Sequence, residues 1–291
     1  MPEPADGSPP VPDRGPDRVP ASVPVGVLGA GRMGLPIVGH LARAGFPVTV
    51  YDPGPDRQDL IEGRGGRFAA TAAEVAGAST VILICVGYEE QIDALLTGPD
   101  GLLPRLKPET VVAVLSTVAP DRVIELARAA QPFGVQVVDA TVCRGGDAAD
   151  RGELLSFVGG PPAVVERITP VLRSYSSDVV RTGDVGSAQV AKAVNNLILW
   201  ACLVADHEGL ALAQRYGVDT AALRTALLGS SAANTALSNW GKQTMAWAED
   251  DLKIVAEMAA AAGVALPQAG VNREICRSLK PRRYQLSEYG I

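Results

Sequence analysis

The chain has 291 residues and a formal net charge of −6, with 47% apolar and 20% charged residues. This length accommodates one large domain or two ordinary ones, and the composition is typical of a globular protein with a sizeable core. The sequence contains no large basic patch, which argues against nucleic acid as the main partner.

Cysteine and histidine are too few and too scattered for several kinds of site. No C-x-x-C pair occurs, so the sequence argues against a disulfide framework or a zinc site and favours a reducing cytoplasm. With two histidines in the chain, a histidine metal cluster or a Ser-His-Asp triad has almost no material, and we expect no metal.

The first 23 residues are rich in Pro, Asp and Gly and predict a disordered tail. They contain no apolar run, so they resemble neither a signal peptide nor an anchor. No segment reaches the roughly 18 uninterrupted apolar residues of a membrane span, and we expect no membrane contact.

From residue 24 to residue 184, predicted strands alternate with predicted helices. This alternation indicates an α/β fold, a doubly wound parallel sheet with helices on both faces. The predicted strands are 23–29, 47–52, 80–87, 110–117, 135–140, 154–160 and 178–183. The predicted helices are 30–45, 72–79, 89–96, 120–134 and 162–175.

Residues 185–291 form a second domain that we predict to be all helical. Apolar residues recur there at spacings of three and four. The predicted helices run from 187 to about 216 and over 219–229, 234–247, 249–263 and 267–280. The final segment, 281–291, is either a tail or a segment that docks on a partner.

A glycine-rich turn, "GAGRMG", connects the first predicted strand to the first helix. Gly29, Gly31 and Gly34 have the G-x-G-x-x-G spacing that allows a tight turn, close approach of a pyrophosphate, and close packing of helix on strand. Arg32 and Met33 complete this predicted cofactor loop, with Arg32 either touching a phosphate or exposed.

The second strand ends in Asp52, where a carboxylate can accept both ribose hydroxyls. The same carboxylate would repel a 2′-phosphate, so we favour NAD over NADP. Val86 and Thr117 end two further strands on the carboxyl side of the sheet, where nicotinamide sits in such folds, and are predicted to line the cofactor.

Lys192 and two asparagines stand at the head of an otherwise apolar helix, "GSAQVAKAVNNLILWACLVA". Burial of an ammonium group is costly, so the lysine has either a function or a position at the helix end from which it reaches solvent. Asn196 lies four residues later on the same helix face, so lysine and amide can point at one ligand.

Four stretches together resemble the β-hydroxyacid dehydrogenase family: "GVLGAGRMG", "STVAPDRVIELA", "DATVCRGGDAADRGELLSFVGG" and "GSAQVAKAVNN". The resemblance runs from about Val25 to about Leu279. It implies a Rossmann domain followed by a helical domain, with Lys192 catalytic and Asn196 holding substrate. A neutral lysine would accept the hydroxyl proton during oxidation, and an ammonium group would donate it during reduction.

The acid-binding loop of the family usually has the sequence D-A-P-V-S-G-G, and here the sequence is "DATVCRG". We predict that Cys143, Arg144 and Gly145 contact the substrate. An arginine suits a sulfonate or phosphonate, and sulfolactaldehyde reductases carry one at the matching place. The alternative is that Arg144 points to solvent or pairs with Asp147 or Asp150.

A second departure lies near the end of the chain. The family usually has Lys-Asp-Leu there, with the lysine beside the active site, and Asp250 stands in its place. The preceding stretch also looks about ten residues short, or roughly three helical turns. Both changes should reshape the substrate pocket, and they place ordinary 3-hydroxyisobutyrate activity in doubt.

We therefore expect an NAD(P)-dependent oxidoreductase that acts on a small anionic β-hydroxy acid or its semialdehyde. The apolar long helix favours a homodimer. The alternatives are a sulfonate- or phosphonate-bearing aldehyde reductase, a reductase of a bulkier biosynthetic substrate, an imine reductase, and a non-catalytic NAD-binding protein. Imine reductases generally lack the lysine found here at position 192.

Overall fold

The computed structural model describes residues 23–290. The tail predicted for residues 1–23 therefore lies outside the described residues, except for Val23.

The described N-terminal domain is built on an eight-stranded sheet with the order β3-β2-β1-β4-β5-β6-β7-β8. The strand order reverses direction between β1 and β4, which is the switch point where ligands bind in open α/β sheets. The strands are β1 (Val25–Leu28), β2 (Val48–Tyr51), β3 (Arg67–Phe68), β4 (Val81–Ile84), β5 (Val111–Val114), β6 (Gln136–Cys143), β7 (Leu154–Gly159) and β8 (Ser176–Gly183).

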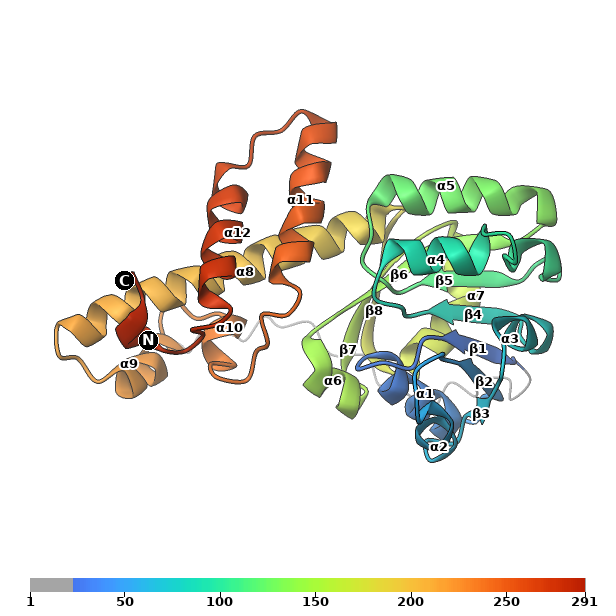
Figure 1. Ribbon diagram of the computed structural model, residues 1–291, viewed down its shortest axis with the longest axis horizontal. Helices are drawn as coiled ribbons and strands as arrows, with labels where there is room; N and C mark the ends of the chain where they lie inside the picture. The colour runs from blue at the N-terminus through green and yellow to red at the C-terminus, as the bar shows by residue number, and fades with distance from the viewer. Residues whose placement is uncertain (1–22, 291) are drawn as a thin grey trace, which may run out of the picture.

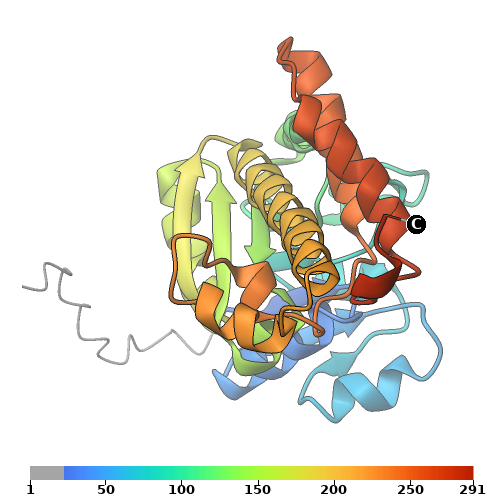
Figure 2. The ribbon, with the colours of Figure 1, turned by 90° about the vertical axis from the view of Figure 1, so that its left-hand side faces the viewer.

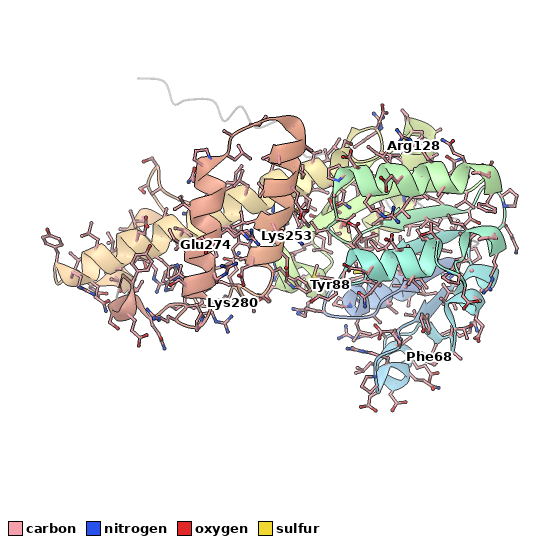
Figure 3. All side chains as sticks on the ribbon, turned by 45° about the horizontal axis from the view of Figure 1, so that its top comes forward. Phe68, Tyr88, Arg128, Lys253, Glu274 and Lys280 are labelled. Carbon is pink, nitrogen blue, oxygen red and sulfur yellow. The ribbon has the colours of Figure 1, made fainter. Side chains whose placement is uncertain are left out.

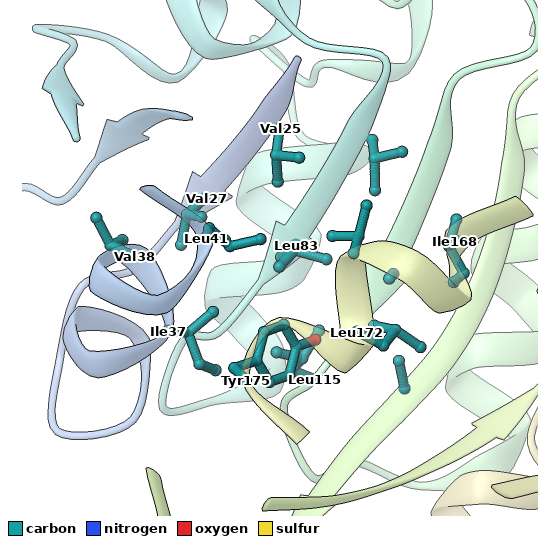
Figure 4. Packing of buried hydrophobic residues seen from close by; sticks show 14 of the residues in the cluster. Val25, Val27, Ile37, Val38, Leu41, Leu83, Leu115, Ile168, Leu172 and Tyr175 are labelled. Carbon is teal, nitrogen blue, oxygen red and sulfur yellow. The ribbon is translucent and has the colours of Figure 1, made fainter. Parts of the chain in front are cut away.

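Helices cover both faces of this sheet, as the alternating pattern predicted (Figure 1). Alternate residues of β1 point to opposite faces, so Val25 and Val27 join one core cluster and Leu28 the other. Figure 4 shows the first cluster, in which α1 and α7 pack on the strands around Tyr175. The helices of this domain are α1 (Gly34–Arg43), α2 (Arg57–Glu62), α3 (Ala72–Ala78), α4 (Glu89–Leu96), α5 (Pro120–Ala130), α6 (Gly145–Arg151) and α7 (Pro162–Arg173), with 3-10 turns η1 (Leu103–Arg105) and η2 (Gln131–Phe133).

The sheet differs from the expected all-parallel arrangement at one pair, because β6 and β7 run antiparallel. A parallel crossover needs about a dozen residues or more, and the segment 144–153 between these strands is too short for one. The short elements α2, β3 and α6 were not predicted. Elements α2 and β3 span six and two residues, and α6 has the sequence GGDAADR, which shows no apolar period.

The C-terminal domain is built around one long helix, α8 (Ser187–Arg215), which leaves the sheet domain and runs the length of the helical domain (Figure 1). The other helices are α9 (Thr220–Leu227), α10 (Thr235–Ser238), α11 (Ala248–Ala262), α12 (Pro267–Leu279) and the 3-10 turn η3 (Leu286–Glu288). Figure 2 shows α8 between the sheet and the pair α11 and α12.

Among the described helices, α8 is the one that is long and apolar enough to cross a membrane, judged by its length and composition alone. It packs against β6 and β7 at its start and against α10, α11 and α12 further along. Trp200, Leu203 and Val204 are buried in the core that these helices share. Its apolar character is therefore used, at least in part, to build the core of the helical domain.

The helix predicted for 234–247 is wrong over most of its length. Only α10 forms, capped by Asn234, and Gly241 then adopts a positive φ of 84°. Trp240 packs on the ring of His207, with 4.5 Å between ring centroids. The local sequence favours a helix here, but the chain turns at Gly241 and the indole of Trp240 packs on His207. Tertiary packing therefore overrides the local helix propensity.

The segment after α12 returns to α8 rather than extending away from the chain. Leu286 is buried, and the Tyr289 hydroxyl donates a hydrogen bond to Glu208 at 2.8 Å. Of the two alternatives, tail or partner-docking segment, the structure places residues 281–290 against their own domain.

Candidate active site

The middle of β6 holds the first turn of α8. Asp139, fully buried, accepts hydrogen bonds from the backbone N–H groups of Gly186 at 2.8 Å and Gln189 at 3.0 Å. Burial raises the pKa of Asp139, and these N–H groups act in the opposite direction by favouring its charged form. Thr141 adds a hydrogen bond to the Ala188 carbonyl at 3.0 Å. The start of α8 is thereby fixed relative to the sheet.

Lys192 lies one turn further along α8 and points back at the end of β6. Its Nζ donates a hydrogen bond to the Val142 carbonyl at 2.7 Å and lies 3.9 Å from the Cys143 sulfur. Burial raises the pKa of the Cys143 thiol, while the charge of Lys192 acts in the opposite direction. Cys143 is 3% exposed, and the raised pKa favours a packed, protonated thiol over a nucleophile.

Asn196 and Asp251 complete a polar cluster around the lysine. Asn196 is buried, helps to lower the pKa of the Asp251 carboxyl, and accepts a hydrogen bond from the Asn195 amide at 3.0 Å. Trp200 Nε1 donates to the Asp251 carboxylate at 3.0 Å. Burial raises the pKa of Asp251, and the positive charge of Lys192 opposes this shift. The cluster thus places the Lys192 ammonium group within electrostatic range of the Asp251 carboxylate, close to the end of β6.

The glycine loop has the shape that a dinucleotide requires. Gly29 has a φ of 98°, and a Cβ on Gly34 would collide with the Gly29 carbonyl oxygen, so helix and loop pack with no room for a side chain. A Cβ on Gly31 would meet no heavy atom within 4 Å. Gly31 therefore leaves open the space through which backbone and pyrophosphate approach each other, and the residues present fit a bound dinucleotide. Arg32 and Met33 follow Gly31, and Met33 is the N-cap residue of α1.

Asp52 lies beside this loop, as predicted from its place after β2. Its two carboxylate oxygens accept backbone N–H bonds from Ala30 at 2.7 Å and Gly54 at 2.8 Å. Arg57 Nε lies 3.6 Å from the same carboxylate, and Arg57 Nη1 donates to the Ala30 carbonyl at 3.3 Å. The Asp52 carboxylate and the Arg57 guanidinium group therefore both lie where the ribose of the adenosine half of a dinucleotide would bind.

The ends of β4 and β5 are joined through Ser116. Its hydroxyl donates to the Val86 carbonyl at 2.8 Å and accepts from the Val86 N–H at 3.0 Å. The side chain of Gln189 in α8 donates a hydrogen bond to the Ser116 carbonyl at 2.8 Å and accepts one from the Val118 N–H at 3.1 Å. These two bonds lie on either side of Thr117, which is half-buried. Val86 and Thr117 thus lie at the sheet edge that also carries the glycine loop.

Two arginines predicted to bind ligands are paired within the chain. Arg144 Nη1 donates to the Asp178 carboxylate at 2.8 Å and to the Ser177 hydroxyl at 2.6 Å, so its guanidinium lies at β8. Arg32 makes two hydrogen bonds, at 3.0 and 2.7 Å, to Asp150 of α6 and lowers the pKa of that carboxyl. The structure pairs Arg144 with neither of the two acids considered as its partners. Contacts of Arg32, Arg144 and Gly145 with ligands stay predictions.

Three residues of this site escaped the sequence analysis. Asp139 and Gln189 lie in quoted motifs, but nothing local signals that a strand carboxylate holds a distant helix. Asp251 stands next to Asp250, which is exposed, whereas Asp251 faces Lys192. The helical spacing of buried Leu252 and Val255 could have indicated which of the two acids faces the interior.

The arrangement has the components of hydride-transfer chemistry at a carbonyl or hydroxyl. A lysine that can exchange a proton lies beside an amide, near a sheet edge shaped for a dinucleotide. The Val142 carbonyl holds the lysine by a hydrogen bond, and the Asp251 carboxylate acts on it electrostatically. The buried surroundings strengthen these electrostatic contacts relative to water.

Comparisons with known proteins agree with this geometry. Residues 24–183 match the NAD binding domain of 6-phosphogluconate dehydrogenase. Residues 186–287 match the family described as NAD-binding of NADP-dependent 3-hydroxyisobutyrate dehydrogenase.

Individual relatives point the same way. The chain is 33% identical to 3-hydroxyisobutyrate dehydrogenase of Pseudomonas aeruginosa, over 74% of this chain and 72% of the relative. It is 30% identical to 2-hydroxy-3-oxopropionate reductase of Escherichia coli, over 86% and 89%. A crystal structure of 3-hydroxyisobutyrate dehydrogenase from Salmonella typhimurium superposes with a TM-score of 0.80 at 26% identity, over 90% and 95%. The chain belongs to the β-hydroxyacid dehydrogenase family of NAD(P)-dependent oxidoreductases.

Proposed function

We propose that this enzyme interconverts a small β-hydroxy acid and its semialdehyde with NAD, and that Lys192 is the general acid and base. The observation that carries the proposal is the placement of Lys192 Nζ, 2.7 Å from the Val142 carbonyl, within electrostatic range of Asp251 and one helical turn from buried Asn196. The bound cofactor would supply or accept the hydride. Lys192 would donate a proton to the carbonyl oxygen in reduction and remove it in oxidation.

Asn196 and the loop after β6 would orient the substrate. The Asn196 amide oxygen accepts a hydrogen bond from Asn195, which restricts its orientation before a substrate arrives. Cys143 would line the pocket as a small packed side chain in the place of the family's serine. The engagement of Arg144 with Asp178 favours a carboxylate substrate over the sulfonate or phosphonate alternative.

For the cofactor, we propose a preference for NAD over NADP because the Asp52 carboxylate would face the adenosine ribose. Arg57, 3.6 Å from that carboxylate, offsets part of its repulsion toward a 2′-phosphate. The expected preference is therefore moderate rather than absolute.

We also propose that the active form is a cytoplasmic homodimer. Val190, Val194 and Ile198 recur at four-residue spacing on α8 and are 43%, 50% and 57% exposed, so they form an apolar stripe that a second copy would cover. The four free cysteines are consistent with a reducing compartment. Sedimentation of wild type and Ile198→Glu tests the dimer, and a monomeric wild type would contradict it.

The decisive experiment measures NADH oxidation with a panel of aldehydes: malonate-type semialdehydes, tartronate semialdehyde, and sulfonate- and phosphonate-bearing aldehydes. Lys192→Met should lower kcat by about 10²- to 10⁴-fold while NADH affinity is retained. The matched control is Lys107→Ala. Lys107 is exposed and precedes β5, so it lies at the amino ends of the strands, away from the candidate site at their carboxyl ends. Equal rates in Lys192→Met and wild type would contradict lysine catalysis.

Two outcomes would favour the alternatives once cyclic imines are added to this panel. Turnover of cyclic imines without turnover of any aldehyde would favour the imine reductase. NADH binding without turnover of any compound would favour the non-catalytic protein.

A further inference from the structure

Two aromatic side chains from different domains meet beside the candidate cofactor site. Tyr88 is the N-cap residue of α4, and Trp247 is the N-cap residue of α11. Their ring centroids are 5.9 Å apart with planes tilted by 56°, a distance at which aromatic rings attract each other. Figure 3 labels Tyr88 at the end of α4 that faces the helical domain.

The pair lies where β4 ends against the glycine loop. A Cβ placed on Gly87 would lie 3.7 Å from Trp247 Cη2, so the indole edge covers the backbone just after Val86. Val86 in turn packs on the loop, since a Cβ on Gly29 would lie 3.2 Å from Val86 Cγ1. Trp247 thus reaches from the helical domain to the residue next to the predicted cofactor contact.

Both rings are held by their helices. Gln91 Oε1 accepts hydrogen bonds from the Gly87 and Tyr88 N–H groups at 3.0 and 3.1 Å, which fixes the backbone that carries Tyr88. The Trp247 carbonyl accepts from the Asp251 N–H at 2.9 Å. Trp247 and Asp251 are therefore one helical turn apart, and a single turn of α11 contacts both β4 and the Lys192 cluster.

The rings also retain open faces. Tyr88 is 56% exposed and Trp247 is 47% exposed, although large aromatic side chains are usually well buried. A half-exposed aromatic pair next to a dinucleotide loop offers a stacking surface for a flat, conjugated ring. The cofactor carries two such rings, which makes it the ligand that this pair fits.

We infer that Tyr88 and Trp247 form an aromatic clamp, in which contact between the two domains retains the bound nicotinamide cofactor. The inference rests on the proposed function. The clamp residues are positioning residues: they slow release of the cofactor and hold the Asp251 end of α11 near Lys192. They take no part in proton transfer.

The test measures the dissociation rate of NADH from the full-length protein, by stopped-flow displacement with excess NAD. Trp247→Ala and Tyr88→Ala should each raise this rate by about 2- to 10-fold. The double variant should exceed the larger single effect only slightly, because one contact is lost in each case. Trp247→Phe and Tyr88→Phe should keep most of the retention.

A spectroscopic readout separates the clamp from a general loss of structure. Reduced nicotinamide absorbs where indole emits, so NADH binding should quench the emission of Trp247. Trp247→Phe should remove part of this quenching, and Trp200, which is hydrogen-bonded to Asp251, should supply the remainder. Trp240→Phe is the matched control, because Trp240 packs on His207 in the helical domain and should leave both quenching and release unchanged.

The outcomes distinguish the clamp from the proposed function. Dissociation rates within twofold of wild type in folded Trp247→Ala and Tyr88→Ala, with turnover intact, would overturn the clamp alone. Failure of the wild type to bind NADH would overturn both. If an alanine variant does not fold, Trp247→Leu and Tyr88→Leu take its place, and release rates within twofold of wild type in these variants would overturn the clamp.

Discussion

The buried carboxylate of Asp139 accepts a hydrogen bond from the backbone N–H of Gln189, 3.0 Å away, and through it β6 holds the helix that carries Lys192. The side chain of Gln189 then bonds the backbone of residues 116 and 118. Gln189 therefore connects the helix that carries Lys192, the proposed proton donor, to the carboxyl end of β5, where the cofactor is proposed to bind.

Asp139→Asn should damage both stability and turnover. An amide replaces one acceptor with a donor that faces a backbone N–H, and a buried group left without a partner costs about 1–3 kcal/mol. Urea unfolding should show a loss of this size, and kcat should fall with it because Lys192 is displaced. Asp100→Asn, at a side chain that is 95% exposed, is the control that should change neither quantity.

Asp251→Asn should lower kcat more than cofactor affinity. The half-buried Asp251 carboxylate interacts electrostatically with the ammonium group of Lys192, so its removal should leave the lysine less well placed and lower kcat by about tenfold or more. The measurement is kcat with NADH saturating, together with the Kd for NADH. Asp250→Asn, at the exposed residue next in sequence, should leave kcat unchanged, and an equal loss in both variants would refute a specific role for Asp251.

Gly31→Ala and Gly34→Ala should separate folding from cofactor binding. At Gly31 the new Cβ meets no atom, so stability should change by less than about 0.5 kcal/mol, while NADH affinity should fall by roughly tenfold or more. At Gly34 the new Cβ meets the Gly29 carbonyl oxygen, so the free energy of unfolding should fall by about 1–3 kcal/mol. Thermal unfolding of the apoprotein and NADH titration measure the two effects. Equal stability losses in the two variants would contradict this assignment.

Asp52→Ala should narrow the preference for NADH over NADPH. Removal of the carboxylate leaves Arg57 to face the ribose, so NADPH affinity should rise relative to NADH by about tenfold. Fluorescence titration with each cofactor gives the ratio. Arg57→Ala provides the opposing test, since it should widen the preference, and an unchanged ratio in both variants would exclude this pair from cofactor selection.

His207 should make the stability of the helical domain fall in mild acid. Burial lowers its pKa from the ordinary value of 6.5, and the hydrogen bond to the Leu203 carbonyl opposes this only in part. Below that value the unfolded chain binds a proton that the folded chain rejects, so stability is present above it and is lost as the pH falls. Each pH unit in this window removes up to about 1.4 kcal/mol until the folded pKa is reached.

The measurement is the Tm of wild type and His207→Gln between about pH 5 and 7.5. The variant should lose most of the dependence, whereas His40→Gln should keep it. The ring of His207 also stacks on Tyr284, so the acid-sensitive part should include the segment that returns to α8. A Tm of wild type that does not change over this range would contradict the role of His207.

The sequence by itself determined the architecture and predicted candidate residues of the site. Strand and helix periodicity over 24–183 predicted the doubly wound sheet, because each element buries a face that repeats along the chain. The spacing of Gly29, Gly31 and Gly34 between a strand and a helix predicted the loop, because backbone geometry there is local. Lys192 was predicted as a candidate functional residue because burying an ammonium group in an apolar helix is costly.

Only the tertiary structure decided which charges meet. Asp139 and Gln189 are 50 residues apart, and Asp251 faces Lys192 while its neighbour Asp250 faces solvent. Arg144 turns to Asp178 of β8, which no local pattern indicates. Tyr88 and Trp247 come together from two domains. Local sequence sets the backbone period, but contacts between distant side chains depend on how the elements pack, and packing is a property of the whole chain.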